Sequence, residues 1–335
     1  MQRKKPSASM ADVAALAKVS PQTVSRVARG EGTVRDETAA RVNDAMNKLG
    51  YVPNVAARAL RSGRFNSIGI AAHHITRTGE AHIIQAVTRA CRAHGYRPIL
   101  TDSASGEAAE LSTSIEQLST IVDGLVVLRL ETEDLQPVRL PLNLPIVVSD
   151  SRHLGDYVSV GSDQIGGARL AVSHLLGLGH RTVHMIGGPE HSVQASARHQ
   201  AWKDLLVATG RDVPPVLMGD WTPKSGYLAG QRLADDPDVT AVFSANDEMA
   251  QGLLRALHEA GRRVPEEVSV VGFDDIAAEY MWPPLTTVAQ DFTRIGEELV
   301  STLMRQMSPN SSTKSQQVLV PGELKVRRST AYLDS

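Results

Sequence analysis

The chain contains, near its N-terminus, the stretch Ser9-Met-Ala-Asp-Val-Ala-Ala-Leu-Ala-Lys-Val-Ser-Pro-Gln-Thr-Val-Ser-Arg26. Ser9 followed three residues later by Asp12 is a capping box, which marks the start of a helix. Ser20 before Pro21 marks a second start, because proline at the first helical position sacrifices no hydrogen bond. Only a short turn separates the two, so the stretch predicts a helix-turn-helix.

The apolar and polar residues of this stretch separate onto different sides of the two helices. The positions expected to face each other and a third helix are Val13, Leu16, Val19, Val24 and Val27. Polar and basic side chains remain on the second helix, where they suit base edges in a DNA major groove. The candidate DNA-contacting residues here are Ser20, Pro21, Gln22, Thr23, Ser25, Arg26 and Arg29.

The distribution of charge separates this segment from the rest of the chain. Residues 1–65 hold 12 Lys and Arg against 5 Asp and Glu, whereas residues 66–335 hold 23 against 32. A helical hairpin that contacts no nucleic acid would also fit the short motif. A basic head on an acidic body instead favours a DNA-binding module fused to a second domain.

A third helix is predicted over residues 36–49, because apolar residues recur at helical spacing and Gly50 stands at the C-cap position. Pro53 and Gly63 then bracket a short helical or linker segment. A helix of that length is marginal by itself in water, so it should be ordered only when docked. We therefore predict a helix-turn-helix domain over residues 1–52 and a hinge helix or linker over residues 53–65.

Beyond residue 65 the chain alternates short apolar runs with helical patterns, which is typical of a parallel α/β fold. The first series of predicted strands covers residues 67–71, 97–101, 124–128, 145–149 and 157–160, and the second covers residues 182–186, 216–218, 240–244 and 268–272. Two parallel-sheet subdomains fit this length, with one cleft where the carboxyl ends of their strands face each other.

Polar residues follow several of these strands, and they suit a saccharide. Carboxylates, an amide and a guanidinium can share sugar hydroxyls, while an indole covers an apolar C–H face. The strand-end residues are Asp150, Arg198, Trp221, Asn246, Asp247, Asp274 and Asp275. Capping of the following helix is the alternative role for such residues, above all for Asp247.

The whole chain resembles the lactose-repressor family of transcription regulators. The motifs that carry the resemblance are Asp12-Val-Ala, Val19-Ser-Pro-Gln-Thr-Val-Ser-Arg26, Gly50-Tyr-Val-Pro-Asn54, Leu175-Leu-Gly-Leu-Gly-His-Arg181, Asn246-Asp-Glu-Met-Ala250, Val270-Val-Gly-Phe-Asp-Asp275 and Pro284-Leu-Thr-Thr-Val288. In the cleft, the motifs resemble the lactose-responsive branch more than the purine-responsive one. The resemblance implies an all-α head with a hinge helix, then a periplasmic-binding-protein-like α/β core over residues 66–335. Its subdomains would comprise residues 66–163 plus 292–320, and 164–291 plus 321–335.

The resemblance also assigns roles to particular residues. Pro21, Gln22 and Arg26 fall on base-contacting positions of the recognition helix. The hinge would contribute Asn54, Ala57 and Leu60 to DNA binding, with Leu60 wedged into the minor groove. The positions implied to contact an effector are Asp150, Arg198, Trp221, Asn246, Asp274, Gln290 and Phe292.

His73 and Arg77 depart from the family pattern, because they bring basic groups to the rim of the cleft. They are added to the candidate effector site. An acidic or longer saccharide would use these groups, and a salt bridge at the rim is the other explanation.

The expected function is a homodimeric repressor that leaves a pseudo-palindromic DNA operator when a galactoside-like inducer binds. A corepressor-dependent regulator is the alternative within the family, and a sugar-binding protein without DNA function is the alternative outside it. We expect no enzyme activity, no cofactor, no metal site and no contact with membranes, because the sequence lacks the corresponding motifs and any apolar run of about 20 residues. The single Cys91 and the absence of an apolar leader favour a cytoplasmic location.

Overall fold

The structure is a computed structural model that describes residues 8–28, 34–52, 63–73, 75–103, 108–128, 138–141, 143–149, 157–308 and 316–333. By its internal contacts the chain divides into two compact units, Met1–Phe65 and Asn66–Ser335.

The first unit contains three described helices, α1 (Met10–Ala17), α2 (Pro21–Ala28) and α3 (Asp36–Leu49). The predicted capping box is present, since Ser9 N donates to the Asp12 carboxylate at 2.8 Å and Asp12 N donates to Ser9 Oγ at 3.2 Å. Ser20 Oγ accepts from Thr23 N at the start of α2. These local hydrogen bonds fix where both helices begin.

The core of this small unit is built from one side of each helix. It contains the buried residues Val13, Ala14, Ala17, Val24, Val42, Ala45 and Met46. Leu16, which was predicted to be interior, is 50% exposed. The prediction for Leu16 was wrong because alanines at positions 14 and 17 complete the packed side of α1, which leaves Leu16 on another side.

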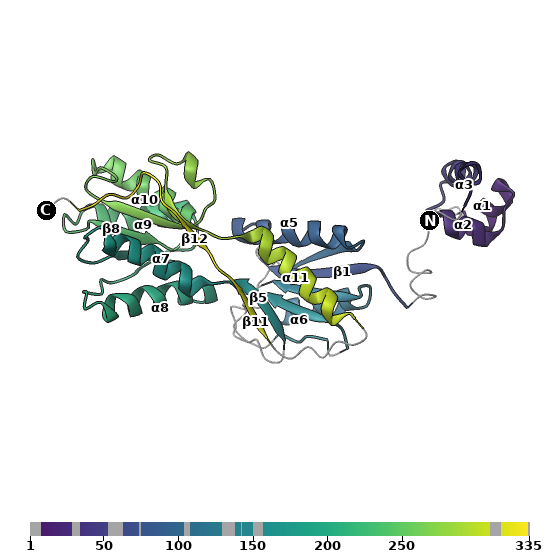
Figure 1. Ribbon diagram of the computed structural model, residues 1–335, viewed down its shortest axis with the longest axis horizontal. Helices are drawn as coiled ribbons and strands as arrows, with labels where there is room; N and C mark the ends of the chain where they lie inside the picture. Colours follow the sequence, from purple (N-terminus) through teal and green to yellow (C-terminus); the bar gives the residue numbers. More distant parts are fainter. Residues whose placement is uncertain are drawn as a thin grey trace, which may run out of the picture. The chain divides into compact units, whose positions relative to one another are not determined.

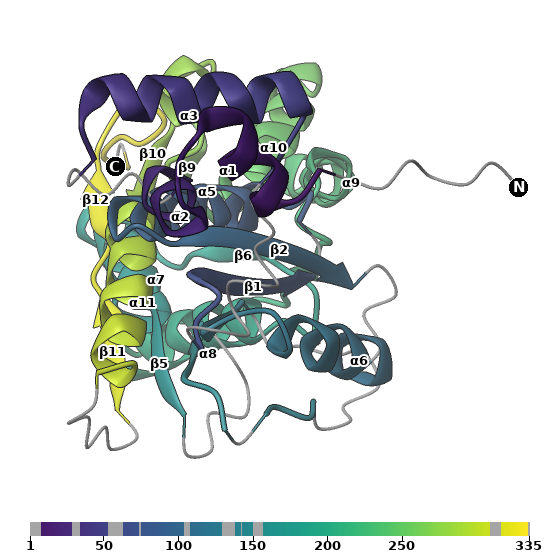
Figure 2. The ribbon, with the colours of Figure 1, turned by 90° about the vertical axis from the view of Figure 1, so that its right-hand side faces the viewer.

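In the second unit, the first sheet has the order β11-β5-β4-β3-β1-β2, and all its neighbouring strands are parallel. Its strands are β1 (Ser67–His73), β2 (Arg97–Ser103), β3 (Gly124–Leu128), β4 (Ile146–Ser149), β5 (Val158–Ser162) and β11 (Gln317–Val320). Alternate residues of these strands belong to two separate apolar clusters. Helices α5 (Thr78–Ala93) and α11 (Phe292–Gln306) cover one side, and α6 (Ala108–Ser119) covers the other (Figure 2).

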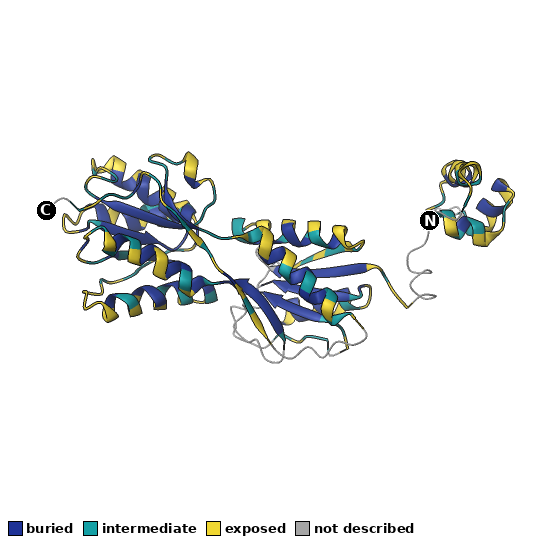
Figure 3. Ribbon diagram, in the orientation of Figure 1, coloured by how far each residue is buried: buried dark blue, intermediate teal, exposed yellow. Residues whose placement is uncertain are grey.

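The second sheet has the order β12-β10-β9-β8-β6-β7 and is parallel except for β12, which runs antiparallel to β10. Its strands are β6 (His184–Gly187), β7 (Leu217–Met218), β8 (Ala241–Ser244), β9 (Ser269–Asp274), β10 (Thr286–Ala289) and β12 (Glu323–Lys325). The helices around it are α7 (Gln164–Gly177), α8 (Val193–Ala208), α9 (Pro223–Ala234), α10 (Asp247–Glu259) and the short η1 (Ala278–Tyr280). Their inner faces and the strands are buried together in one core (Figure 3).

Among the described residues, the chain passes from one sheet to the other at three places (Figure 1). It crosses between β5 and α7, between β10 and α11, and between β11 and β12. Two crossings are joined, because Asp163 N donates to the carbonyl oxygen of Val320 at 2.9 Å. We refer to these segments as the crossovers.

Candidate functional site

The outward side of α2 is polar. Pro21, Gln22 and Arg26 are exposed, whereas Val24 is fully buried beneath them. Ser20 and Thr23 are engaged locally, with their hydroxyl oxygens 3.0 Å apart. Among the described candidates, this leaves Gln22 and Arg26 best placed to reach a partner in a groove.

Several predicted contact residues lie outside the described part of the chain. They are Arg29, Asn54, Ala57, Leu60 and Asp150. His73 is the last residue of β1, and its side chain likewise lies outside the description.

A small cavity lies between the two sheets of the second unit, at the ends of their strands. We call it the inter-sheet cavity, and its lining residues are Arg77, Thr78, Gly79, Glu80, Gln194, Arg198, Trp221, Asn246, Glu248, Asp274 and Gln290. Its free volume is about 30 Å³, far below the several hundred Å³ usual for a ligand pocket. Side chains from the two walls therefore occupy the space between the sheets.

The structure brings together six of the nine residues predicted to contact an effector. Those lining the cavity are Arg77, Arg198, Trp221, Asn246, Asp274 and Gln290. Phe292 is not among the lining residues, and its ring stacks on His82 of α5 at a centroid distance of 5.4 Å. The assignment of these residues to effector binding stays a prediction.

The cavity is also lined by five residues that were not predicted from the sequence: Thr78, Gly79, Glu80, Gln194 and Glu248. Each lies in the first turn of a helix, in α5, α8 or α10. First turns that follow parallel strands sit at the ligand-binding edge of a sheet. The position of these residues in a first turn could have indicated them from the sequence. Glu248, for example, is only two residues beyond Asn246.

Arg198 is the buried centre of the cavity wall, at 3% exposure. Its Nε donates to Gln164 Oε1 at 2.7 Å, and its Nη1 donates to the carbonyl oxygen of Ala245. Its guanidinium carbon lies 3.7 Å from the ring centre of Phe273. The guanidinium is therefore held both by acceptors in its plane and by an aromatic face.

This guanidinium is part of a closed ring of hydrogen bonds. Arg198 Nη2 donates to Asp274 Oδ1 at 3.5 Å, and Gln290 Nε2 donates to the same oxygen at 2.5 Å. Gln164 Nε2 donates to Gln290 Oε1 at 3.5 Å, which closes the ring. We call these four residues the Arg198 ring.

Asn246 connects the cavity to α10. Its Oδ1 caps the helix by accepting from Met249 N at 2.9 Å, and its Nδ2 donates to the carbonyl oxygen of Trp221 at 3.1 Å. The indole N–H of Trp221 is buried and has no hydrogen-bond partner among the described residues. A buried donor without a partner is costly, so it marks a place where a ligand oxygen would be stabilised.

The carboxylates near the cavity have different roles. Asp275 pairs with Arg327 at 2.7 Å. Asp247 is fully buried and accepts from Thr287 Oγ1 and Ile276 N at 2.6 and 2.7 Å. Burial, followed by the charge of Asp274, raises the pKa of Asp247 well above its ordinary value. Asp247 therefore supports the loop after β9, and it does not line the cavity.

Two contacts between side chains narrow the cavity. Arg77 Nη1 lies 3.9 Å from Oε1 of Glu80, which is 2% exposed, so the salt bridge considered for Arg77 is present. Thr78 Oγ1 donates to Glu248 Oε1 at 2.7 Å, and this bond joins the helix α5 of the first sheet to the helix α10 of the second.

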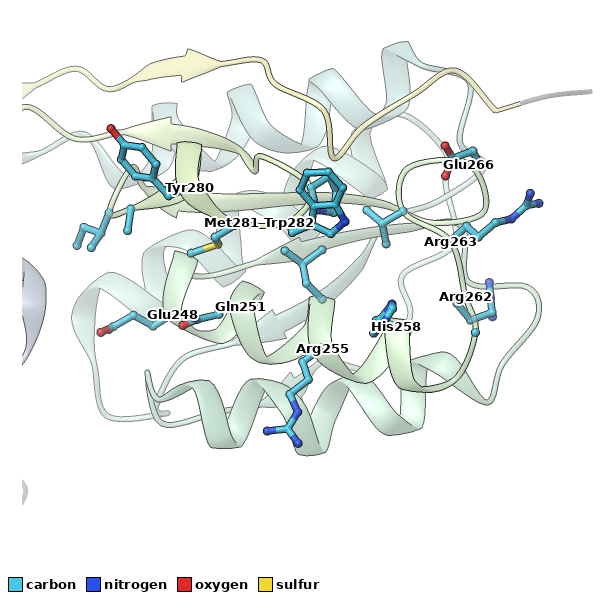
Figure 4. A pocket seen from close by; sticks show the side chains of 16 residues that line it. Glu248, Gln251, Arg255, His258, Arg262, Arg263, Glu266, Tyr280, Met281 and Trp282 are labelled. Carbon is cyan, nitrogen blue, oxygen red and sulfur yellow. The ribbon is translucent and has the colours of Figure 1, made fainter.

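A separate groove of about 910 Å³ runs along the outer side of α10. Tyr280, Met281 and Trp282 line it on one side, and Arg255 and His258 line it from the helix (Figure 4). Tyr280 is 83% exposed and Trp282 is 88% exposed. Large exposed aromatic side chains of this kind mark interaction surfaces. We call this surface the α10 groove.

Two features are absent from the described part of the chain. No helix there is long and apolar enough to cross a membrane. No group of three or more His, Cys, Asp or Glu residues there could hold a metal ion.

Comparison with known proteins gives matches along nearly the whole chain. Residues 9–54 match the family described as bacterial regulatory proteins, lacI family, and residues 172–330 match a periplasmic binding protein-like domain. The transcriptional regulator CelR of Thermobifida fusca is 35% identical, over 98% of this chain and 99% of its own.

Two solved structures resemble this chain over nearly its whole length. The lac repressor dimer bound to operator and the anti-inducer ONPF has a TM-score of 0.82 at 30% identity, covering 98% of this chain and 100% of the other. A CelR–cellobiose complex has a TM-score of 0.72 at 32% identity, covering 96% and 99%. The predicted fold class, a helix-turn-helix head followed by a two-sheet parallel α/β core, is confirmed. The chain belongs to the lacI family of bacterial regulatory proteins and is a DNA-binding transcriptional regulator.

Proposed function

We propose that this protein is a repressor that binds operator DNA through α2 and leaves it when a neutral saccharide binds in the inter-sheet cavity. The observation that carries the proposal is the composition of the cavity, which combines an indole with closely spaced carboxylates, amides and a guanidinium. Such a set suits a ring with several hydroxyls and an apolar face.

The charges of the cavity favour a neutral effector over an anionic one. The carboxylates of Glu80, Glu248 and Asp274 outnumber the cations of Arg77 and Arg198. Both arginines have acidic partners. A neutral polyhydroxylated ring can exchange hydrogen bonds with these groups without leaving a buried charge unpaired, which an anion would do.

The sugar we propose first is a galactoside, from the resemblance of the cleft motifs to the lactose-responsive branch. A second candidate is a cellobiose-like β-glucoside. It is favoured by the similarity to CelR, whose complex with cellobiose resembles this chain over nearly its full length.

We propose binding without catalysis. The carboxyl group with the strongly raised pKa, that of Asp247, is fully buried and does not line the inter-sheet cavity. A general acid must come within hydrogen-bond reach of its substrate, so this group is unsuited to act on a bound sugar. Binding to chromosomal operators further implies a cytoplasmic location.

We propose that the α10 groove contacts a second copy of the chain. A related repressor forms a dimer on its operator. A surface with Tyr280 and Trp282 exposed would bury large aromatic area in such a contact. A dimer places two α2 helices on two half-sites, which accounts for the expected pseudo-palindrome.

The test is a titration of protein against an operator selected from random DNA, with and without lactose or cellobiose. Weaker operator binding with one sugar present supports the proposal, and tighter binding would make the protein a corepressor-dependent regulator. Arg26→Ala should cost about 1–3 kcal/mol and relax the preference at one position per half-site. An equal loss on operator and random DNA would mean that Arg26 contacts only phosphate.

A further inference from the structure

We infer that Gln164 is a positioning residue for the effector site, which holds Arg198 in place from one crossover. This inference rests on the proposed function of the inter-sheet cavity. Gln164 itself does not line that cavity. Its role would be exerted through Arg198 and Gln290, which do.

The geometry of Gln164 is specific at both ends of its amide. Oε1 accepts from Arg198 Nε at 2.7 Å, and Nε2 donates to Gln290 Oε1 at 3.5 Å. The amide supplies an acceptor and a donor on separate atoms, so one side chain bonds to both Arg198 and Gln290 and closes the Arg198 ring. Gln164 is 8% exposed, so little of this side chain is in contact with solvent.

Because of where Gln164 lies in the chain, these hydrogen bonds connect two of the crossovers. Gln164 is the first residue of α7, directly after the crossover that leaves β5. Gln290 follows β10, directly before Asp291 caps α11 at a second crossover. The Arg198 ring thus joins two of the three crossovers to the two charged groups at the centre of the cavity.

The ring also explains how the buried charge of Arg198 is tolerated. A guanidinium at 3% exposure needs partners for its N–H groups, because an unsatisfied buried donor on a charged group is expensive. Nε bonds to Gln164, which does not line the cavity, while Nη2 bonds to Asp274, which does. Loss of the Nε acceptor would let the guanidinium rotate out of the arrangement that a sugar would meet.

The experiment compares three variants of the full chain by calorimetry with lactose and cellobiose. Gln164→Met keeps the length of the side chain and removes both hydrogen bonds. Gln164→Glu keeps an oxygen for Arg198 Nε and loses the donor to Gln290. Gln200→Met is the matched control, because Gln200 lies on the same helix as Arg198 and, within the described part of the chain, its hydrogen bond goes to the exposed Asp204 at 2.6 Å.

We expect Gln164→Met to bind the sugar about 10- to 100-fold more weakly, as for loss of a hydrogen bond to a charged group. Gln164→Glu should stay within about threefold of the unsubstituted chain, since the acceptor for Arg198 is restored. Gln200→Met should bind normally. Thermal unfolding of each variant shows whether a weaker affinity reflects a loss of folded protein.

Three results would overturn the inference. Gln164→Met could bind as tightly as the unsubstituted chain, even with a lower melting temperature, which would make Gln164 a structural residue only. Gln164→Glu could bind at least about tenfold more weakly than the unsubstituted chain, which would show that an acceptor for Arg198 Nε is not what sets the affinity; this measurement decides the matter even if Gln164→Met does not fold. Failure of the unsubstituted chain to bind either sugar would overturn the proposed function, and this inference with it.

Discussion

Gly188, the residue after β6, is placed so that an added methyl group would displace the indole of Trp221, which we expect to cover the apolar face of the sugar. A Cβ at this position would lie 2.5 Å from Cζ2 and 2.8 Å from Cε2 of Trp221. Ordinary carbon–carbon contacts are about 3.5–4.0 Å, so the indole would have to retreat by about 1 Å. The guanidinium of Arg198 stands 5.5 Å from the ring centre, so a shift of the indole would change its position relative to this group.

The predicted outcome for Gly188→Ala follows from this overpacking. A forced shift of this size in a packed site costs about 1–3 kcal/mol. If the shift is taken up by the ring, sugar affinity should fall by about 10- to 100-fold. Calorimetry with lactose and cellobiose measures this effect, and operator binding without sugar should be unchanged.

Gly177→Ala is the control for this experiment. Gly177 ends α7, and an added Cβ there would meet no atom within 4 Å. This substitution should leave sugar binding unchanged and stabilise the fold by up to about 1 kcal/mol. Normal sugar affinity and normal stability in Gly188→Ala would refute the idea that Gly188 fixes the position of the indole.

Three further predictions concern stability and assembly. Lys18→Gly should stabilise the first unit by about 1 kcal/mol, because Lys18 has φ 54° at the C-cap of α1; faster amide exchange in α1 would contradict this. Burial lowers the pKa of His180 below its ordinary 6.5, so its neutral form favours the folded state. The unsubstituted chain should therefore be more stable than His180→Asn by its full margin above about pH 6.5, and this margin should shrink as the pH falls below that value. A difference between their urea midpoints that grows at acid pH would contradict the prediction. Trp282→Asp should weaken dimerisation at least about tenfold, as measured by sedimentation, whereas Val207→Asp, also at an exposed position, should not. If both variants dimerise equally well, the α10 groove is not the dimer interface.

Much of the fold could be predicted because its signals are local. Capping residues such as Ser9 fix where α1 begins, and buried apolar runs such as residues 124–128 leave little freedom except to be central strands. The exposed Leu16 was not predictable in the same way. An eight-residue helix offers too few turns to define its packed side, and small alanines packed there instead.

The candidate site was predictable only in part, for a related reason. The position of a residue after a parallel strand is a topological fact, so Asn246 and Asp274 could be placed near one cavity, whereas Gln290 was assigned to it only through the family resemblance. The direction of a side chain depends on its neighbours. Phe292 stacks on His82 rather than lining the cavity, and no pattern in the sequence indicates that contact.

The internal bonding of the inter-sheet cavity explains why residue types do not identify the sugar. Asp274 and Asn246 are already hydrogen-bonded to protein groups, and Thr78 bonds to Glu248 across the cavity. An effector therefore gains only the difference between its own bonds and those that it replaces. That difference in free energy depends on the exact positions of the hydrogen-bonding atoms, which the types of the lining residues do not specify. The same competition supplies a mechanism for regulation, because a ligand that breaks bonds between the two sheets binds best to the arrangement in which they are already broken. By linkage, if that arrangement holds operator less well, the sugar weakens operator binding by the same factor by which operator weakens sugar binding.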